Sequence, residues 1–165
     1  MSLTHVHYLR IRYSETDQMG TYYNSRALEW FERGRTELCR TTGVPYRHWE
    51  KRGLMLPLIE AHVDFLGAAV YDDLLKMTTT VVMQSKARMR FDVVIEHAGG
   101  GGPVCRGWTV HAVTDTAGRP VRPPKWVLEL IREPAPGRSG TAPRDRDHDR
   151  PSCSKPRFTP ANEPR

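Results

Sequence analysis

A carboxylate and a flexible turn stand just ahead of a predicted helix near the start of the chain. In YSETDQMGTYYNSRALEWFERGRTE, residues 13–37, Asp17 is followed by Gly20 and then by Asn24. A helix start offers unpaired N–H groups and a partial positive charge, which suit a developing oxyanion. Gly20 permits a tight turn that could fold Asp17 back across that helix start. Such a pair is the minimum apparatus for acyl hydrolysis, although the same spacing also suits an ordinary turn.

The helix that this turn introduces is predicted from its apolar spacing. Its stripe consists of Ala27, Leu28, Phe31, Leu38 and Cys39, and Gly34 marks a place where a neighbour can approach closely. Asn24 or Ser25 is the expected N-cap, and Gly43 followed by Pro45 is the expected stop.

Most of the remaining chain alternates between apolar and polar residues, as strands do. Residues 5–13 are expected to form a strand with His7, Leu9, Ile11 and Tyr13 on one face. Further strands are expected at 59–65, 74–84, 89–95 and 104–114, and short helices at 45–52 and 124–132. The links between the later strands are too short for parallel crossovers, so most pairs should be antiparallel. The expected fold is α+β, one curved antiparallel sheet packed on one long helix.

Composition separates a body, residues 1–133, from a tail, residues 134–165, that is rich in Pro, Arg, Asp and Ser. The tail is expected to be disordered, because it has too few apolar residues to offset the entropy of ordering. The formal charge of +6 is divided evenly between the two parts, so the body is only mildly basic and does not indicate nucleic acid. There is no apolar run of membrane-spanning length and no signal core, so a cytoplasmic protein without a membrane partner is expected. Neither the three Cys nor the His residues have ligand spacing, so no metal and no other cofactor is expected.

The run Y-x-E-T-D-x-M-G-x-x-Y, followed by N-S-x-x-L-x-W-F-E-x-G-R-T-E, resembles the signature of hotdog-fold thioesterases of the 4-hydroxybenzoyl-CoA and short-chain acyl-CoA type. LPLIEAHVDFLGAAVYDDLL at 56–75 and GRPVRPP at 118–124 resemble later parts of the same family. The resemblance covers residues 7 to about 131 in order. It implies a sheet wrapped around the long helix, an acyl-CoA substrate, and a homodimer or homotetramer with its sites at subunit interfaces.

The resemblance also assigns residues. Asp17 matches the family's catalytic carboxylate, which acts either as a nucleophile that forms an acyl-enzyme anhydride or as a general base that activates water. The backbone N–H near Asn24 matches the group that polarises the thioester carbonyl. Many relatives have His at this position, and Asn cannot act as a base near neutral pH. The further candidates for substrate contact are Tyr23, Ser25, Glu60, Lys86, Arg88 and Arg90.

Several alternatives stay open at this point. Glu15 either tunes the pKa of Asp17 or is simply solvated, and we favour solvation. Glu60 and His62 share a strand face and either approach the acyl group or lie on a wet face. Lys86, Arg88 and Arg90 either bind the phosphates of coenzyme A or form a solvated strand face. For the whole protein, the alternative to a thioesterase is a catalytically silent hotdog domain that binds acyl groups or a protein partner. The acyl group, and the choice between coenzyme A and acyl carrier protein, cannot be read from the sequence.

Overall fold

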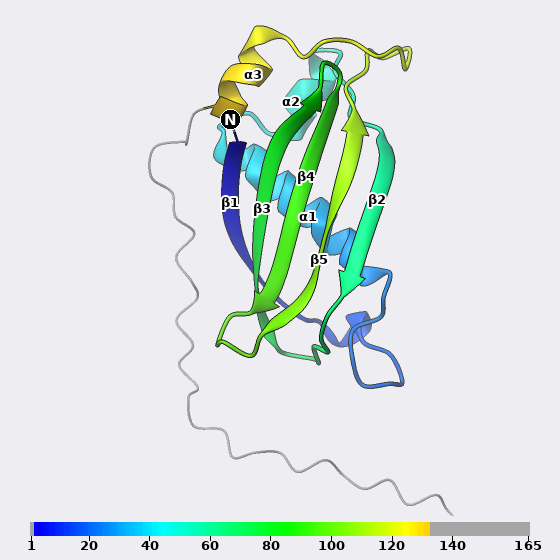
Figure 1. Ribbon diagram of the computed structural model, residues 1–165, viewed down its shortest axis with the longest axis vertical. Coiled ribbons are helices and arrows are strands. Elements are labelled where there is room, and N and C mark those ends of the chain that lie inside the picture. The colour runs from blue at the N-terminus through cyan, green and yellow to red at the C-terminus, as the bar shows by residue number, and fades with distance from the viewer. Residues whose placement is uncertain (1, 133–165) are drawn as a thin grey trace, which may run out of the picture.

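A computed structural model of the chain describes residues 2–132, and the predicted tail at 134–165 lies outside them (Figure 1). Five strands form one antiparallel sheet in the order β1-β3-β4-β5-β2. The strands are β1 (Ser2–Arg10), β2 (Leu58–Phe65), β3 (Leu74–Ser85), β4 (Arg88–His97) and β5 (Pro103–Ala112). The helices are α1 (Arg26–Thr41), α2 (Tyr46–Lys51) and α3 (Lys125–Arg132), with a 3-10 turn at Tyr13–Glu15.

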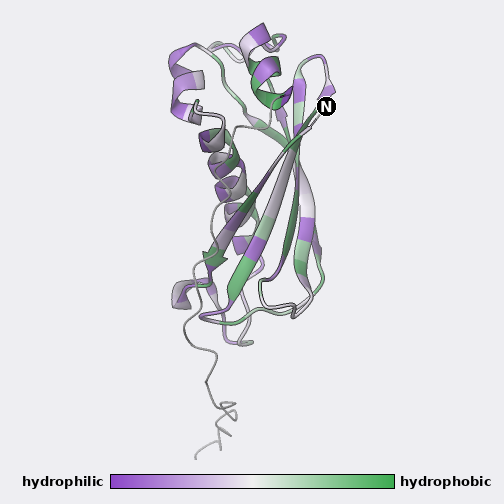
Figure 2. Ribbon diagram, turned by 90° about the vertical axis from the view of Figure 1, so that its left-hand side faces the viewer, coloured by the Kyte–Doolittle hydropathy of each residue, from purple (hydrophilic) through white to green (hydrophobic). Residues whose placement is uncertain are grey.

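The long helix α1 lies along one face of the sheet. Figure 2 shows this face from the side, and the opposite face carries no helix among residues 2–132. Strand alternation creates this difference, since β4 buries Met89, Phe91, Val93 and Ile95 and turns charged residues the other way. The predicted α+β hotdog fold, an antiparallel sheet around one long helix, is confirmed.

The helix approaches the sheet most closely at Gly34. A Cβ atom built there would lie 2.4 Å from Thr79 Oγ1 and 2.9 Å from Met77 Sδ on β3. Any larger residue would therefore force the Thr79 and Met77 side chains, or α1 itself, to move, which explains the glycine within the helix.

Two predicted faces need correction. The first strand was expected to continue to residue 13, with Tyr13 on the same face as Leu9 and Ile11, but β1 ends at Arg10 and the Tyr13 side chain is 79% exposed. Leu28 was expected in the buried stripe of α1, but it is 42% exposed, whereas Trp30 is 2% exposed. The buried arc of α1 follows positions 27, 30, 31, 34 and 38, and Leu28 lies outside it.

Strand β2 is an edge strand with little burial on either face. Within residues 2–132 it pairs only with β5, and Leu58, Ile59 and Phe65 are each about half exposed. Its alternation was predicted correctly, but the burial that such alternation normally indicates is missing. One edge of the sheet therefore carries apolar side chains and unpaired backbone groups together.

The buried residues form two clusters at opposite halves of the sheet. The first includes Tyr22, Trp30 and Phe31 and lies beneath the start of α1. The second includes Trp49, Val127 and Ile131 and is covered by α2 and α3. The helix start that carries the candidate site therefore stands on the first cluster.

Candidate active site

The segment between β1 and α1 is a closed loop. Thr16 and Tyr22 form an isolated antiparallel bridge, and the Asp17 amide donates to the Thr21 carbonyl at 3.0 Å. The Gly20 amide donates to the Asp17 carbonyl at 3.0 Å, and Gly20 has a φ of 73°. This left-handed conformation favours glycine, so Gly20 makes the turn that the sequence predicted.

Asp17 lies half-buried in this loop. Its Oδ1 atom accepts a hydrogen bond of 2.8 Å from the Met19 amide. Its Oδ2 atom has no protein partner among residues 2–132. One oxygen therefore orients the carboxylate and leaves the other available for a substrate or a water molecule.

The start of α1 presents free backbone donors. Arg26 and Ala27 donate to the carbonyls of Tyr23 and Asn24, but the amides of Asn24 and Ser25 have no acceptor within residues 2–132. Ser25 is the N-cap residue by position, and its side chain makes no capping hydrogen bond. Unpaired N–H groups at the positive end of a 16-residue helix are suited to bind an oxyanion.

Glu15 is buried, so the expectation that it is solvated was wrong. It is 4% exposed, and its carboxylate accepts hydrogen bonds from the Arg12 amide at 2.7 Å and the Trp30 indole at 3.1 Å. Burial alone would raise the pKa of Glu15, but the bonds from Arg12 and Trp30 lower it below its ordinary value. Its hydrogen-bond donors are the backbone and side chain of Arg12 and the indole of Trp30, fifteen residues away, and the sequence pattern does not show that these groups meet.

Tyr22 anchors the other side of the loop in the core. Its side chain is 5% exposed, and its ring lies 5.0 Å from that of Trp30 and 6.4 Å from that of Phe65. The Tyr22 amide donates to the Ala69 carbonyl at 2.9 Å. The loop that carries Asp17 is thus tied to the helix and to the segment after β2.

Large apolar side chains remain exposed around this end of the molecule. Tyr23, one of the predicted substrate contacts, is 51% exposed beside the free amide of Asn24. Phe65 and Tyr71 are 55% and 57% exposed. An apolar rim next to unpaired donors suits a ligand that carries both an apolar group and a carbonyl.

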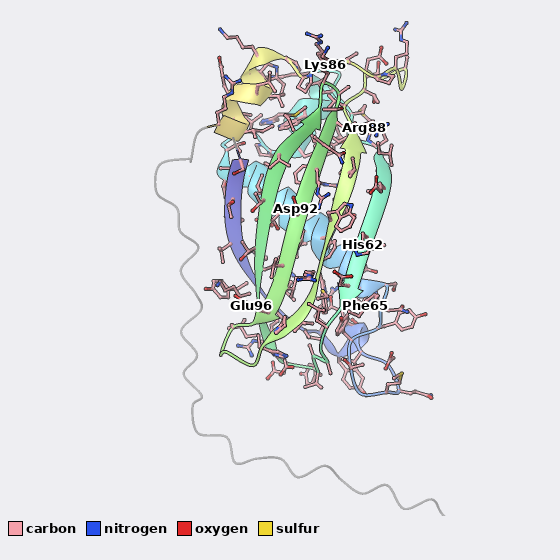
Figure 3. The ribbon with its side chains drawn as sticks, viewed as in Figure 1. His62, Phe65, Lys86, Arg88, Asp92 and Glu96 are labelled. Atoms are coloured by element: carbon pink, nitrogen blue, oxygen red, sulfur yellow. The ribbon has the colours of Figure 1, made fainter. Side chains whose placement is uncertain are left out.

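Lys86 and Arg88 lie at the opposite end of the sheet from Asp17. Figure 3 shows both at the β3–β4 turn, while Phe65 lies near the other end. Neither side chain makes an ion pair or a hydrogen bond within residues 2–132. A single subunit does not bring these two cations together with Asp17.

Glu60 and Arg90 belong to a network on the outer face of the sheet, away from α1. The Trp108 indole donates to Glu60 at 3.1 Å, and its ring stacks on His62 with centroids 4.1 Å apart. The Arg90 guanidinium lies 4.3 Å from the same ring and donates to Asp92. Glu60 and His62 do share a face, but it is the wet outer face and not the one beneath the helix.

The remaining candidates among the described residues are a reactive thiol, a metal site and a membrane-spanning helix. Burial raises the pKa of the Cys39 thiol to about 11 and that of Cys105 to about 12, so neither is a thiolate at neutral pH. No group of three His, Cys, Asp or Glu side chains within residues 2–132 is placed to hold a metal ion. Over the same residues, no helix has both the length and the apolar character needed to cross a membrane.

Comparison with known proteins gives a consistent result. The family model described as the Thioesterase-like superfamily matches residues 11–131. The Bacillus subtilis protein YneP is 39% identical over 57 residues, which are 34% of this chain and 41% of YneP. The acyl-CoA thioesterase YbgC of Haemophilus influenzae is 34% identical over 85 residues, which are 51% of this chain and 62% of YbgC. The chain thus spans only part of the length of these curated relatives.

A solved structure extends the likeness to the whole fold. The DHNA-CoA thioesterase of Staphylococcus aureus superposes with a TM-score of 0.67 at 26% sequence identity. The superposition covers 73% of this chain and 80% of that one.

Proposed function

Because the chain belongs to the Thioesterase-like superfamily, we propose that it hydrolyses the thioester bond of an acyl-CoA or aroyl-CoA to the free acid and coenzyme A. The proposal rests on one observation. The loop between β1 and α1 carries both the Asp17 carboxylate, one oxygen of which has no partner within residues 2–132, and the unpaired amides at the start of the helix. In this proposal Asp17 is the catalytic carboxylate, and the Asn24 amide polarises the thioester carbonyl.

The chemistry follows from these two groups. In the general-base route, Asp17 takes a proton from water as the water attacks the thioester carbon. The oxyanion that forms is bound by the Asn24 and Ser25 amides, and its collapse expels the coenzyme A thiolate, which takes up the proton. In the nucleophilic route, Asp17 attacks the carbon directly, the C–S bond breaks to release the coenzyme A thiolate, and water then hydrolyses the resulting anhydride to the free acid and the Asp17 carboxylate.

Isotope labelling identifies the nucleophilic route when water attacks the aspartyl carbon of the anhydride. A single turnover in water enriched in oxygen-18 places the label only in the released acid if Asp17 acts as a base. If Asp17 is the nucleophile, water can attack the aspartyl carbon of the anhydride, and mass spectrometry then finds label in a peptide that contains Asp17.

We also propose that the chain forms a homodimer through β2. One edge of the strand has no partner strand within residues 2–132, and its exposed residues Leu58, Ile59 and Phe65 would be covered by a second copy. Light scattering at micromolar concentration is expected to give at least twice the chain mass. A monomer that still hydrolyses thioesters would contradict this arrangement.

A dimer of this kind would also give Lys86 and Arg88 a role. Antiparallel pairing of β2 with its copy reverses the second sheet, so the β3–β4 turn of one subunit points toward the Asp17 end of the other. The unpaired cations of that turn could then bind the phosphates of coenzyme A. Arg90 is less suited to this role, because its guanidinium already binds Asp92 and Trp108.

The decisive test is release of free thiol from a panel of aromatic, short-chain and long-chain acyl-CoA thioesters. We expect turnover of at least one class well above the rate without protein. Binding of acyl-CoA without thiol release would instead identify a silent acyl-binding domain. The same panel on acyl carrier protein decides which thiol carrier is preferred.

A further inference from the structure

We infer that Glu15 is a positioning residue, whose buried carboxylate fixes the distance between the Asp17 carboxylate and the amides at the start of α1. This inference rests on the proposed thioester hydrolysis. Glu15 itself is 4% exposed and is not placed to touch a substrate.

The side chain of Glu15 joins the segment that follows β1 to the helix α1. Oε2 accepts from the Arg12 amide at 2.7 Å, while Oε1 accepts from the Arg12 guanidinium and the Trp30 indole, both at 3.1 Å. Trp30 lies one turn inside α1 and is 2% exposed, so it moves with the helix. Each carboxylate oxygen thus holds a donor on a different element.

The backbone of Glu15 closes the base of the loop that carries Asp17. The Tyr23 amide donates to the Glu15 carbonyl at 2.8 Å. Asp17 follows Glu15 by two residues, and Asn24 follows Tyr23 directly. Asp17 therefore follows the hydrogen-bonded pair of Glu15 and Tyr23 into the loop, and Asn24 follows the same pair toward α1. Glu15 ties this pair to α1 through its hydrogen bond with Trp30.

A carboxylate is needed at this position because both of its oxygens act as acceptors. In Glu15→Gln, one acceptor oxygen becomes an NH2 group, which would face either the Arg12 amide or the Trp30 indole. One buried donor would then lose its acceptor, and the backbone pair of Glu15 and Tyr23 would shift. Small displacements of reacting groups can lower rates by up to about a hundredfold.

The experiment compares two variants at the site with two matched controls at the other end of the molecule. Glu15→Gln is matched by Asp115→Asn, since the Asp115 carboxylate also accepts from backbone amides, those of Ala117 and Arg119, at 2.9 Å. Trp30→Phe is matched by Trp49→Phe, since the Trp49 indole is likewise buried and donates to the Val44 carbonyl at 3.1 Å. For each, kcat and KM for thiol release and the melting temperature are measured on one preparation.

We expect Glu15→Gln and Trp30→Phe each to lower kcat about tenfold or more, with KM changed less than about twofold. The double variant should lose little beyond the larger single loss, because the two residues act through one hydrogen bond. The controls should lower the melting temperature while kcat stays near the wild-type value.

The inference is overturned if Glu15→Gln keeps the wild-type kcat, or if the controls lower kcat as much as the site variants do. If Glu15→Gln does not fold, Trp30→Phe decides: an unchanged kcat overturns the inference and a reduced kcat supports it. A wild-type chain that releases no thiol from any substrate overturns the proposed function instead, before any variant is made.

Discussion

Two buried tryptophans at opposite ends of the sheet show how differently the ends are built. Trp30 and Trp49 are 2% and 3% exposed, and each donates its indole N–H to one acceptor. The acceptor of Trp30 is the buried carboxylate of Glu15, whereas that of Trp49 is the backbone carbonyl of Val44. A buried charge is costly unless it is hydrogen-bonded, and Glu15 meets this condition through Arg12 and Trp30, whereas Trp49 needs only a neutral carbonyl.

The surroundings of the two tryptophans differ in the same way. Trp49 packs edge-to-face on Trp126, with centroids 5.5 Å apart, and the Arg52 guanidinium covers Trp126 at 4.6 Å. Around the loop before α1, by contrast, Met19 is 86% exposed and two helix-start amides have no acceptor within residues 2–132. The α3 end is closed by packing, and the Asp17 end keeps apolar surface and donors open to a ligand.

The largest functional difference between the Asp17 end and the α3 end is expected from the substitution Asp17→Asn. This change keeps the shape of the side chain and the acceptor for the Met19 amide, but it removes the charge. Hydrolysis should fall by a factor on the order of a hundred or more, the usual scale for losing a general base. The melting temperature should change little, because such a turn carboxylate contributes at most roughly 1 kcal/mol.

Thiol release and thermal unfolding on the same Asp17→Asn preparation check this prediction. Full activity would return Asp17 to the role of an ordinary turn residue and remove the functional difference between the two ends.

The converse change is Ile131→Ala in α3. Ile131 is 5% exposed within the cluster covered by α2 and α3. Removal of its side chain should lower the free energy of unfolding by about 2–4 kcal/mol, the usual range for such a cavity. Urea unfolding measures this loss, and kcat at a temperature where the variant is folded should equal that of the wild type. A tenfold drop in kcat would show that the two ends are coupled.

Much of the fold could be predicted because it depends on local periodicity. Alternation placed β3, β4 and β5 within a few residues, and helical spacing placed α1 one residue from its observed start. The exposure of β2 could not be predicted, since it depends on the strand order, which is set by packing between distant segments. The exposure of Leu28 has the same cause, because the part of a helix that a sheet covers is decided by the crossing of the two.

In the candidate site, too, the features set by local sequence could be predicted and those set by distant contacts could not. The Asp17 turn and the helix start at Ser25 are adjacent in sequence, so local chemistry was enough to place them. Glu15 was misjudged because Trp30, its partner, stands fifteen residues away, and a lone carboxylate is usually solvated. The alternation of side chains along β2 showed that Glu60 and His62 share a face, but alternation alone does not say which face packs against the helix.

A smaller effect is expected from pH through His111. His111 is 1% exposed, and burial, together with the Arg35 guanidinium, lowers its pKa from 6.5 to about 4. Between these values the unfolded chain binds a proton that the folded chain does not. The folded state should therefore lose up to about 3 kcal/mol as the pH falls from 6.5 to 4.

Melting curves between pH 4 and pH 8 measure this dependence, with His111→Gln as the control. The variant should show a shallower loss on the acid side, although His5 and His7, whose pKa values are also lowered by burial, add to the slope in both proteins. Identical slopes for the two proteins would show that His111 does not contribute.

The smallest effect is expected from removal of the tail. The sequence motifs end by about residue 131, the family match ends at residue 131, and the composition changes at Pro134. The residues described above for the Asp17 loop and for the cluster under α3 all lie within residues 2–132. A chain truncated after Glu133 should therefore keep the wild-type melting temperature within about 2 °C, because surface changes away from packed groups are usually worth less than about 0.5 kcal/mol. Its kcat and KM for thiol release should also match those of the full chain. A large fall in melting temperature would mean that residues 134–165 stabilise the α3 end, and a fall in kcat alone would assign them to the Asp17 end.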